Sequence, residues 1–328
     1  MKRIIISILL ILGLVIAIIL TTNKENETYS NNKIIVSEVT HSIFYTPWYV
    51  ALEKGYFKEE GLNIEVQLTP GADKVASSVL SDQAQIGFSG PEATIYLYNN
   101  SNQKLISFAS LTKKDGQFIV GDCSLKDNFT LKDLKNKSVL AGRHGGMPLM
   151  MFEYALKEQN IDKNNIKIDT SVEFANLTSA FIAKQGDFVN LFEPNATAIE
   201  NQNLGCVLSS LGNLTGNVPY TTFYTKEDFI NNNKDVIQKF NNALNKGIQF
   251  TKENTKETIA KVIKNQFPDT NVKDLENIIE RYKQIDAWYD TTKIDLNDFD
   301  RLQEILIYNK NISKKIEPNI LITNEFNK

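Results

Sequence analysis

Short apolar runs alternate with amphipathic helical stretches from residue 34 onward. The runs IIVSEV, NIEVQL and AQIGFSG predict strands, and the stretch PWYVALEKGYF between the first two predicts a helix. That helix would begin at Pro47 and stop near Gly55, because proline suits the first helical turn and glycine ends helices. Strands that alternate with helices in this way are typical of βαβ units with parallel pairing.

The same alternation restarts after Asp122. The runs SVLAGR, IKIDTSV, DFVNLFEP and GCVLSSLG predict strands, and PLMMFEYALKEQ, NLTSAFIAKQ and NATAIENQ predict the helices between them. The segment VPYTTFYTK then reads as a crossing segment with a strand, and the pattern beyond Lys226 is wholly helical. A chain of 328 residues is long enough for two lobes, each with its own core.

The first 22 residues differ from all the others. Lys2 and Arg3 precede an uncharged apolar run from Ile4 to Leu20, which predicts a signal peptide or a retained signal anchor. The anchor is favoured slightly, because AIILTTN offers few of the small residues that a cleavage site needs. Residues 23–33 are polar and predict a flexible tether. We therefore expect an exported protein, held at the outer face of the membrane or secreted after cleavage.

Composition excludes several classes of function. The formal net charge is -3, so nothing favours a nucleic-acid partner. Cys123 and Cys206 are the two cysteines and form no Cys-x-x-Cys pair, so we expect no structural zinc. They could form one disulfide in an exported protein or remain buried thiols. The two histidines lack His-Glu-x-x-His spacing and no Gly-x-Ser-x-Gly elbow is present, so we expect no metal, no cofactor and no catalytic residue.

The turn AGRHGGMP is the most conspicuous candidate for ligand binding. A phosphate-binding loop needs Lys and Ser or Thr after its glycines, but here Met147 and Pro148 follow Gly145 and Gly146. Similar small-residue turns occur at Gly71 and at Ser89–Gly90. Turns that follow parallel strands meet at one edge of a sheet, where ligands collect. Three of them predict a cleft, although each alone could be purely structural.

Several side chains near these turns could contact a ligand. Arg143 suits a carboxylate, sulfonate or phosphate but could equally pair with a surface acid. Glu92 and Glu193 could bind an amine or simply stabilise a helix N-terminus. Aromatic side chains could stack on a flat ligand or pack in the core; they are Phe44, Tyr45, Trp48 and Trp288. The histidines His41 and His144 both follow strands, so we expect them to approach one cleft from opposite sides.

At these residues a family resemblance appears. The segments FYTPWYVALEKGYFKEEGLNIEV, GADKVASSVLSDQAQIGFSGPEATIYL and NLFEPNATAIE resemble the solute-binding proteins of ABC importers. The similar branch is the one that binds nitrate, sulfonates, taurine or thiamine-type pyrimidines, and the resemblance spans roughly residues 34–310. The chain departs from Gram-positive members of this family in lacking a lipobox cysteine.

The resemblance implies a type II periplasmic-binding-protein fold, with two α/β lobes, two crossing segments and a ligand cleft between them. The lobes would comprise residues 34–122 with 219–328, and residues 123–218, with crossings near Asp122 and Pro219. The implied ligand contacts are His41, Phe44, Tyr45, Gly71, Asp73, Ser89, Gly90, Glu92, Arg143, His144, Gly145, Gly146, Met147 and Glu193. As aromatic candidates, Trp48 and Trp288 complete the predicted site.

The implied function is capture of a small organic solute by lobe closure, with delivery to an ABC permease and its ATPase. The protein would act as a monomer. Two ligand classes remain open, a thiamine-type pyrimidine and an aliphatic sulfonate, taurine or nitrate-like compound. The alternatives are an enzyme on the same fold, similar to pyrimidine synthases, and a ligand sensor without transport. The synthases, however, carry a cysteine-rich motif that is missing here.

Overall fold

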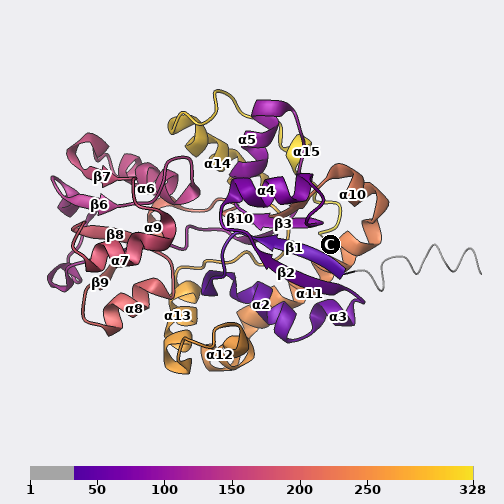
Figure 1. The fold of residues 1–328 in the computed structure, drawn as a ribbon, viewed down its shortest axis with the longest axis horizontal. Coiled ribbons are helices and arrows are strands. Elements are labelled where there is room, and N and C mark those ends of the chain that lie inside the picture. Colours follow the sequence, from indigo (N-terminus) through magenta and orange to yellow (C-terminus); the bar gives the residue numbers. More distant parts are fainter. Residues whose placement is uncertain (1–32, 328) are drawn as a thin grey trace, which may run out of the picture.

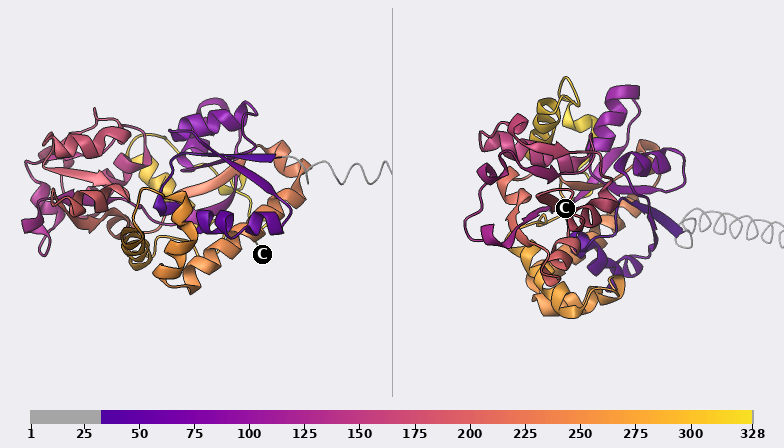
Figure 2. Two further views of the ribbon diagram at one scale, coloured as in Figure 1. Left: turned by 60° about the horizontal axis from the view of Figure 1, so that its bottom comes forward. Right: turned by 60° about the vertical axis from the view of Figure 1, so that its left-hand side comes forward.

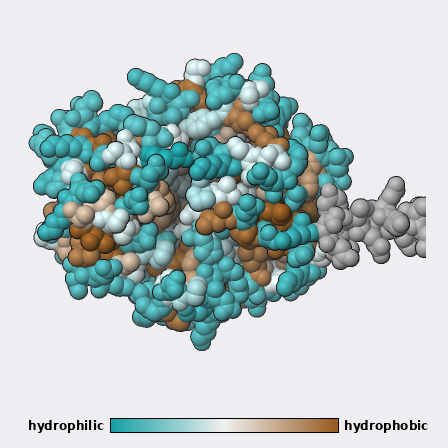
Figure 3. All heavy atoms as spheres, viewed as in Figure 1, coloured by the Kyte–Doolittle hydropathy of each residue, from teal (hydrophilic) through white to brown (hydrophobic). Residues whose placement is uncertain are grey.

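Two α/β lobes lie side by side in the computed structural model, which describes residues 33–327 (Figures 1 and 2). The predictions made for residues 1–22 and for the tether up to residue 32 lie outside the described residues. Within the described range, none of the helices combines the length and the apolar character needed to span a membrane. Hydrophilic residues dominate the face seen in Figure 3, with apolar residues in small separate groups.

The first lobe contains a five-stranded sheet in the order β2-β1-β3-β10-β4. Strand β1 pairs in parallel with β2 and β3, whereas β10 runs antiparallel to both β3 and β4. The strands are β1 (Lys33–Glu38), β2 (Asn63–Leu68), β3 (Ile86–Ser89), β4 (Ile106–Thr112) and β10 (Thr221–Thr225).

The second lobe contains a sheet of the same size in the order β7-β6-β8-β5-β9. Strand β6 pairs in parallel with β7 and β8, and β5 runs antiparallel to β8 and β9. The strands are β5 (Phe118–Gly121), β6 (Ser138–Leu140), β7 (Lys167–Asp169), β8 (Phe188–Leu191) and β9 (Cys206–Ser210).

In each sheet, the antiparallel strand is the one that the chain forms after it crosses from the other lobe. Strand β5 follows β4 of the first lobe, and β10 follows the last elements of the second lobe. The lobe boundary predicted near Asp122 is therefore wrong, because β5 ends before it and already pairs within the second sheet. The chain crosses at residues 113–117 and returns at 216–220, close to the predicted crossing at Pro219.

Helices cover both faces of the first sheet, with α4 and α5 on one face and α2, α3 and α11 on the other (Figure 1). Gly247 of α11 packs so closely on α2 that a Cβ there would collide with the Pro47 carbonyl oxygen. The helices of this lobe are α2 (Thr46–Glu53), α3 (Tyr56–Glu59), α4 (Ala72–Leu80), α5 (Glu92–Ser101), α10 (Glu227–Asn232), α11 (Lys234–Glu253), α12 (Lys256–Ile263) and α13 (Val272–Gln284).

Among the described residues, the second lobe carries fewer helices than the first, and helices near the C-terminus lie where the two lobes meet. In Figure 1, α13 lies below and α14 above the region where the sheets meet. The helices of the second lobe are α6 (Met147–Glu158), α7 (Leu177–Ile182), α8 (Asn195–Asn201) and α9 (Leu211–Thr215), followed at the end of the chain by α14 (Leu296–Tyr308) and α15 (Pro318–Leu321). Short 3-10 turns are η1 (Ile43–Tyr45), η2 (Cys123–Leu125), η3 (Leu131–Leu134), η4 (Lys163–Asn165), η5 (Phe174–Asn176) and η6 (Lys264–Gln266).

Cys123 and Cys206 form a disulfide in the second lobe, with their Cα atoms 4.8 Å apart. Of the two states that the sequence left open, the structure therefore contains the bonded one. The bond ties η2 to the start of β9, beside the pairing of Gly121 with Cys206. Disulfides of this kind persist in oxidising compartments, which is consistent with an exported protein.

Candidate functional site

A cavity of about 1200 Å³ lies between the two lobes. The first lobe contributes the loops that follow β1, β2 and β3, and the second lobe contributes those that follow β6, β7 and β8. Carboxyl ends of parallel strands from both sheets therefore converge on one space, as ligand sites in α/β folds do. The predicted site residues among those that line it are Tyr45, Gly71, Asp73, Gly90, Glu92, Arg143, His144, Gly145, Gly146 and Met147.

The glycine-rich turn contributes much of the second lobe's wall. Gly142 and Gly145 have φ angles of 91° and 77°, in the left-handed region that favours glycine. This backbone course brings Arg143 and His144 into the cavity ahead of α6. The structure thus assigns the turn to the cleft between the lobes.

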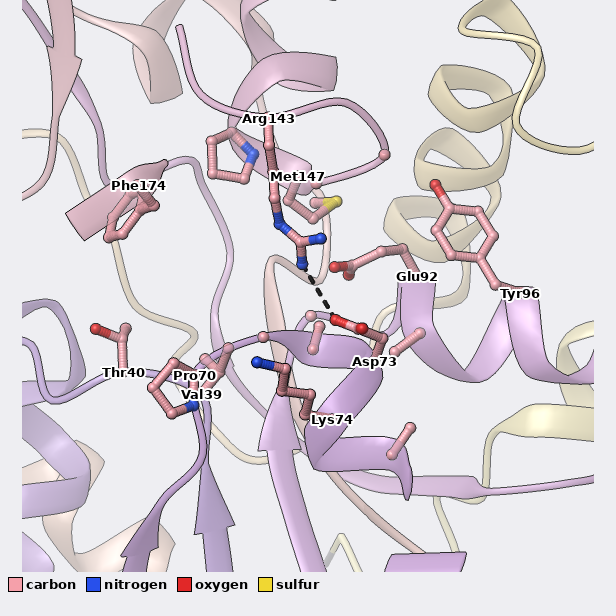
Figure 4. Close-up of a pocket in the computed structure, with 18 of the residues that line it drawn as sticks. Val39, Thr40, Pro70, Asp73, Lys74, Glu92, Tyr96, Arg143, Met147 and Phe174 are labelled. Carbon is pink, nitrogen blue, oxygen red and sulfur yellow. Dashed lines mark hydrogen bonds and ion pairs between the residues drawn. The ribbon is translucent and has the colours of Figure 1, made fainter. Parts of the chain in front are cut away.

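In Figure 4, an ion pair spans the space between the two lobes. Arg143 of the second lobe donates to Asp73 Oδ1 of the first lobe at 3.1 Å. Both side chains are well exposed, at 48% and 68% respectively. Exposed pairs contribute only about 0–1 kcal/mol. This contact can therefore break and re-form readily when the lobes move.

Glu92, the first residue of α5, is nearly fully buried at 4% exposure. Figure 4 shows its carboxylate directed toward the space beside the Arg143 guanidinium. Among the described residues, no group forms a hydrogen bond with Glu92 Oε2. Burial raises the pKa of Glu92 to about 7, although its own backbone N–H and the charge of Arg143 oppose the shift.

Gly90 makes the position of Glu92 possible. A Cβ at residue 90 would collide with Glu92 Oε2. The neighbouring Ser89, predicted as a ligand contact, does not line the cavity. Its hydroxyl is buried and lies 2.7 Å from the Tyr224 hydroxyl, so it belongs to the sheet packing.

His41 does not face His144 across the cleft, so the expected approach of the two histidines is wrong. Its Nε2 lies 2.8 Å from the Gln266 carbonyl oxygen, and its Nδ1 lies 3.0 Å from the Tyr49 hydroxyl. The buried Glu38 carboxylate raises the pKa of His41 through a hydrogen bond, although burial opposes this. His41 therefore joins β1 to the segment after α12, outside the cavity.

The aromatic residues divide between core and cavity. Trp48 is fully buried among Phe57, Phe223 and Phe240, so its predicted contact with a ligand is wrong. Phe44 is buried as well, and Trp288 donates its indole N–H to the Phe44 carbonyl oxygen at 2.7 Å. Tyr45 is the member of the predicted aromatic set that lines the cavity.

Glu193 is buried beneath the junction of the lobes, away from the cavity. It forms an ion pair with Arg281 of α13 and accepts hydrogen bonds from the Thr197 backbone N–H at 2.9 Å and hydroxyl at 3.0 Å. Arg281 also donates to Glu200 at 2.7 Å. Burial raises the pKa of Glu193, and these partners oppose the shift. Its predicted ligand role is therefore wrong, because its oxygens are already occupied.

Sequence reasoning missed several residues of the cavity. Tyr96 lies one helical turn after Glu92 on α5, a spacing that could have suggested a shared face. Phe174 follows β7 in a polar segment and is 37% exposed, which is unusual for a phenylalanine. No local signal marked Lys74, Phe192 and Tyr220, which also line the cavity. In residues 33–327 there is no group of three or more His, Cys, Asp or Glu side chains that could hold a metal ion.

Comparison with known proteins decides the family. Residues 43–258 match the family described as NMT1/THI5 like. The chain belongs to this family. It is also 38% identical over 304 residues to YtlA of Bacillus subtilis (strain 168), which bears the provisional description of a binding protein. That match covers 92% of this chain and 90% of YtlA.

Solved structures confirm the fold. The periplasmic aliphatic sulphonate binding protein SsuA from Escherichia coli matches with a TM-score of 0.70 at 15% identity, over 90% of this chain and 99% of that one. The alkanesulfonate-binding protein SsuA from Xanthomonas axonopodis pv. citri matches with a TM-score of 0.69 at 13% identity, over 89% and 98%. The protein thus has the predicted type II periplasmic-binding-protein fold, two α/β lobes with a cleft between them.

Proposed function

We propose that this protein is the solute-binding component of an ABC import system. It captures a small organic solute in the cavity between the lobes and delivers it to a membrane permease. The observation that carries this proposal is the cavity itself, which is large enough for a small organic ligand and is lined by both lobes. Membership of the NMT1/THI5-like family and the 38% identity to a binding protein support it.

Ligand capture would proceed by closure of the lobes about the two crossing segments. A ligand that touches both walls binds the closed state more tightly than the open state, and this difference in affinity drives the closure. Arg143 from the second lobe and Asp73 from the first lie where such a ligand would bridge the walls. Their exposed ion pair would yield to stronger contacts with the ligand.

A thermal-unfolding panel tests the proposal. The two classes to be compared are pyrimidines of the thiamine type and aliphatic sulfonates, with taurine and nitrate alongside the latter. A ligand present at 100 times its dissociation constant stabilises the folded protein by about 2.7 kcal/mol. Stabilisation by one class would identify the solute, and no shift with any compound would reject both classes.

Transport and localisation need separate measurements. Deletion of the gene is expected to abolish uptake of the solute identified by the panel. Unchanged uptake would instead favour a sensor, and conversion of the bound compound would favour an enzyme. Export is expected to place the protein outside the cytoplasmic membrane. Mass spectrometry of the mature N-terminus tests retention, because a start near residues 22–30 would rule out the anchor.

A further inference from the structure

Glu92 is the one carboxylate in the cavity wall that is both deeply buried and missing a partner among the described residues. Its Oε2 accepts no hydrogen bond, although the side chain is 4% exposed. Leaving a buried polar group unpaired costs about 1–3 kcal/mol, and more when the group is charged. Native proteins rarely accept that cost without a reason, and functional sites are the usual reason.

The neighbouring cation does not remove this cost. Arg143 is held by Asp73 at 3.1 Å, and its charge only partly offsets the burial of Glu92. The amino group of Lys74, although it lines the same cavity, is directed away from Glu92 in Figure 4. The protein therefore supplies no donor to Glu92 Oε2, which packs against Gly90, while the carboxylate as a whole belongs to the cavity wall.

The local backbone is adapted to keep the carboxylate in this place. Gly90 leaves room that any larger residue would take from Glu92 Oε2. Position 92 begins α5, where the helix dipole favours a negative charge. A glycine at 90 and a glutamate at the first helical position together hold an acceptor toward the cavity.

We propose that the ligand carries an amino, ammonium or amidine nitrogen that donates its N–H to the Glu92 carboxylate. This inference rests on the proposed function, because it assigns the chemistry of the solute that the cleft captures. A charge-assisted hydrogen bond would restore the partner that the folded protein lacks. The pKa of about 7 agrees with this role, since a cationic ligand would hold Glu92 ionised.

Paired compounds that differ in one amino group test the proposal on both open ligand frameworks. The pairs are 2-aminoethanesulfonate with ethanesulfonate, and 4-aminopyrimidine with pyrimidine. A charge-assisted hydrogen bond is worth about 1.5–3 kcal/mol, so the amino member should bind at least about tenfold more tightly. Calorimetry at pH 8 gives each affinity. Equal binding of ethanesulfonate and 2-aminoethanesulfonate would overturn this inference but leave the proposed function intact.

Small cations test the same contact without any assumption about the framework. Methylguanidinium is expected to raise the melting temperature of the wild-type protein at pH 8 more than tetramethylammonium, which has no N–H. Glu92→Gln should abolish this difference. Glu227→Gln should preserve it, because Glu227 also begins a helix but is exposed and lies outside the cavity.

Two results of the cation experiment would also overturn the proposal. One is a wild-type protein that responds equally to methylguanidinium and tetramethylammonium. The other is a Glu92→Gln variant that keeps the wild-type preference. Failure of the proposed function is a different result, namely unchanged uptake after deletion of the gene, and it does not depend on either cation.

Discussion

Glu92 and Glu193 occupy similar places in the two lobes, but their surroundings differ. Each follows a buried strand and precedes or begins a helix, and each is almost fully buried. Glu193 meets Arg281 and two donors of Thr197, whereas Glu92 Oε2 meets no donor from the described chain. A buried carboxylate with partners can stabilise a particular arrangement of the lobes, whereas one without partners is a cost that a ligand can remove.

The contacts that join the lobes also differ between the Glu193 side and the Glu92 side of the junction. Around Glu193, the Ser42 hydroxyl donates to the Glu193 carbonyl oxygen at 3.1 Å, and the Glu193 N–H donates to the Tyr282 hydroxyl at 3.2 Å. That hydroxyl donates in turn to Gly116 in the crossing segment at 3.2 Å. Around Glu92, the lobes are joined by the exposed ion pair between Arg143 and Asp73 and by a hydrogen bond from the Tyr96 hydroxyl to Met150 Sδ at 3.3 Å. The Glu193 side is therefore the more firmly held of the two.

The largest expected effect is the loss of Arg281. Arg281→Met should destabilise the protein by about 3 kcal/mol, because it leaves the buried Glu193 without its cation. Chemical denaturation at pH 7 measures the change in unfolding free energy. A loss below about 0.5 kcal/mol would show that the Glu193 side is no stronger than an ordinary surface pair.

The second-largest effect on the unfolding free energy is expected at Glu92, and it is a stabilisation. Glu92→Gln should stabilise the ligand-free protein by about 2 kcal/mol at pH 8, because a neutral amide replaces a desolvated carboxylate. The gain should shrink toward pH 5 and vanish below pH 4.5, where Glu92 is protonated in both the folded and the unfolded state. Thermal unfolding of the variant and the wild type at both pH values measures this, and equal gains at pH 5 and pH 8 would contradict it.

The pH dependence of this stability effect follows from the direction of the Glu92 pKa shift. Its pKa rises from 4.5 in the unfolded chain to about 7 in the folded one, so the folded state holds the proton more tightly. The contribution of Glu92 to folding stability is therefore greatest below pH 4.5 and falls as the pH rises toward 7. Arg143 and Asp73 act electrostatically on this carboxylate. Burial raises the pKa of the neighbouring tyrosines and the charge of Glu92 adds to the shift; they are Tyr45, Tyr96, Tyr220 and Tyr224.

Asp115 in the crossing segment has a pKa raised to about 7 by burial and adds a slope of the same sign. The decisive quantity is therefore the difference between the wild type and Glu92→Gln across pH 5 to 8. A constant difference over that range would show that Glu92 does not titrate there.

The smallest effect is expected at Arg143. Arg143→Met should change the unfolding free energy by less than about 0.5 kcal/mol, since the pair with Asp73 is exposed. The same variant should weaken an anionic ligand strongly and a neutral heterocycle little. Denaturation and ligand titration on one preparation measure both quantities. Destabilisation comparable to that of Arg281→Met would show that the Glu92 side stabilises the fold as strongly as the Glu193 side.

The local sequence pattern predicted where the cleft would be but not how each side chain would face it. Strand–turn–helix patterns located the turns at Gly71, Gly90 and Gly145, because cleft position depends on strand polarity, which is local. The pattern could not show that His41 would meet Gln266, a residue 225 positions away. It could not show that Arg281 would meet Glu193 across 88 positions either.

Strand β5 shows the same limit at the level of the fold. Its partners β8 and β9 lie much later in the chain, so no local pattern could assign it to the second sheet. Trp48 is another case, because a large aromatic residue at a helix start suits either a ligand or a core. Only the packing of Phe223 and Phe240 around Trp48 shows that this side chain belongs to the core.

The most direct test compares Glu92→Gln with Glu193→Gln in the ligand-free protein at pH 8. Both changes remove one negative charge and preserve the shape of the side chain. We expect a higher melting temperature for Glu92→Gln and a lower one for Glu193→Gln, because only Glu193 loses an ion pair. Shifts of the same sign in the two variants would contradict the assignment of Glu92 to the ligand and of Glu193 to the fold.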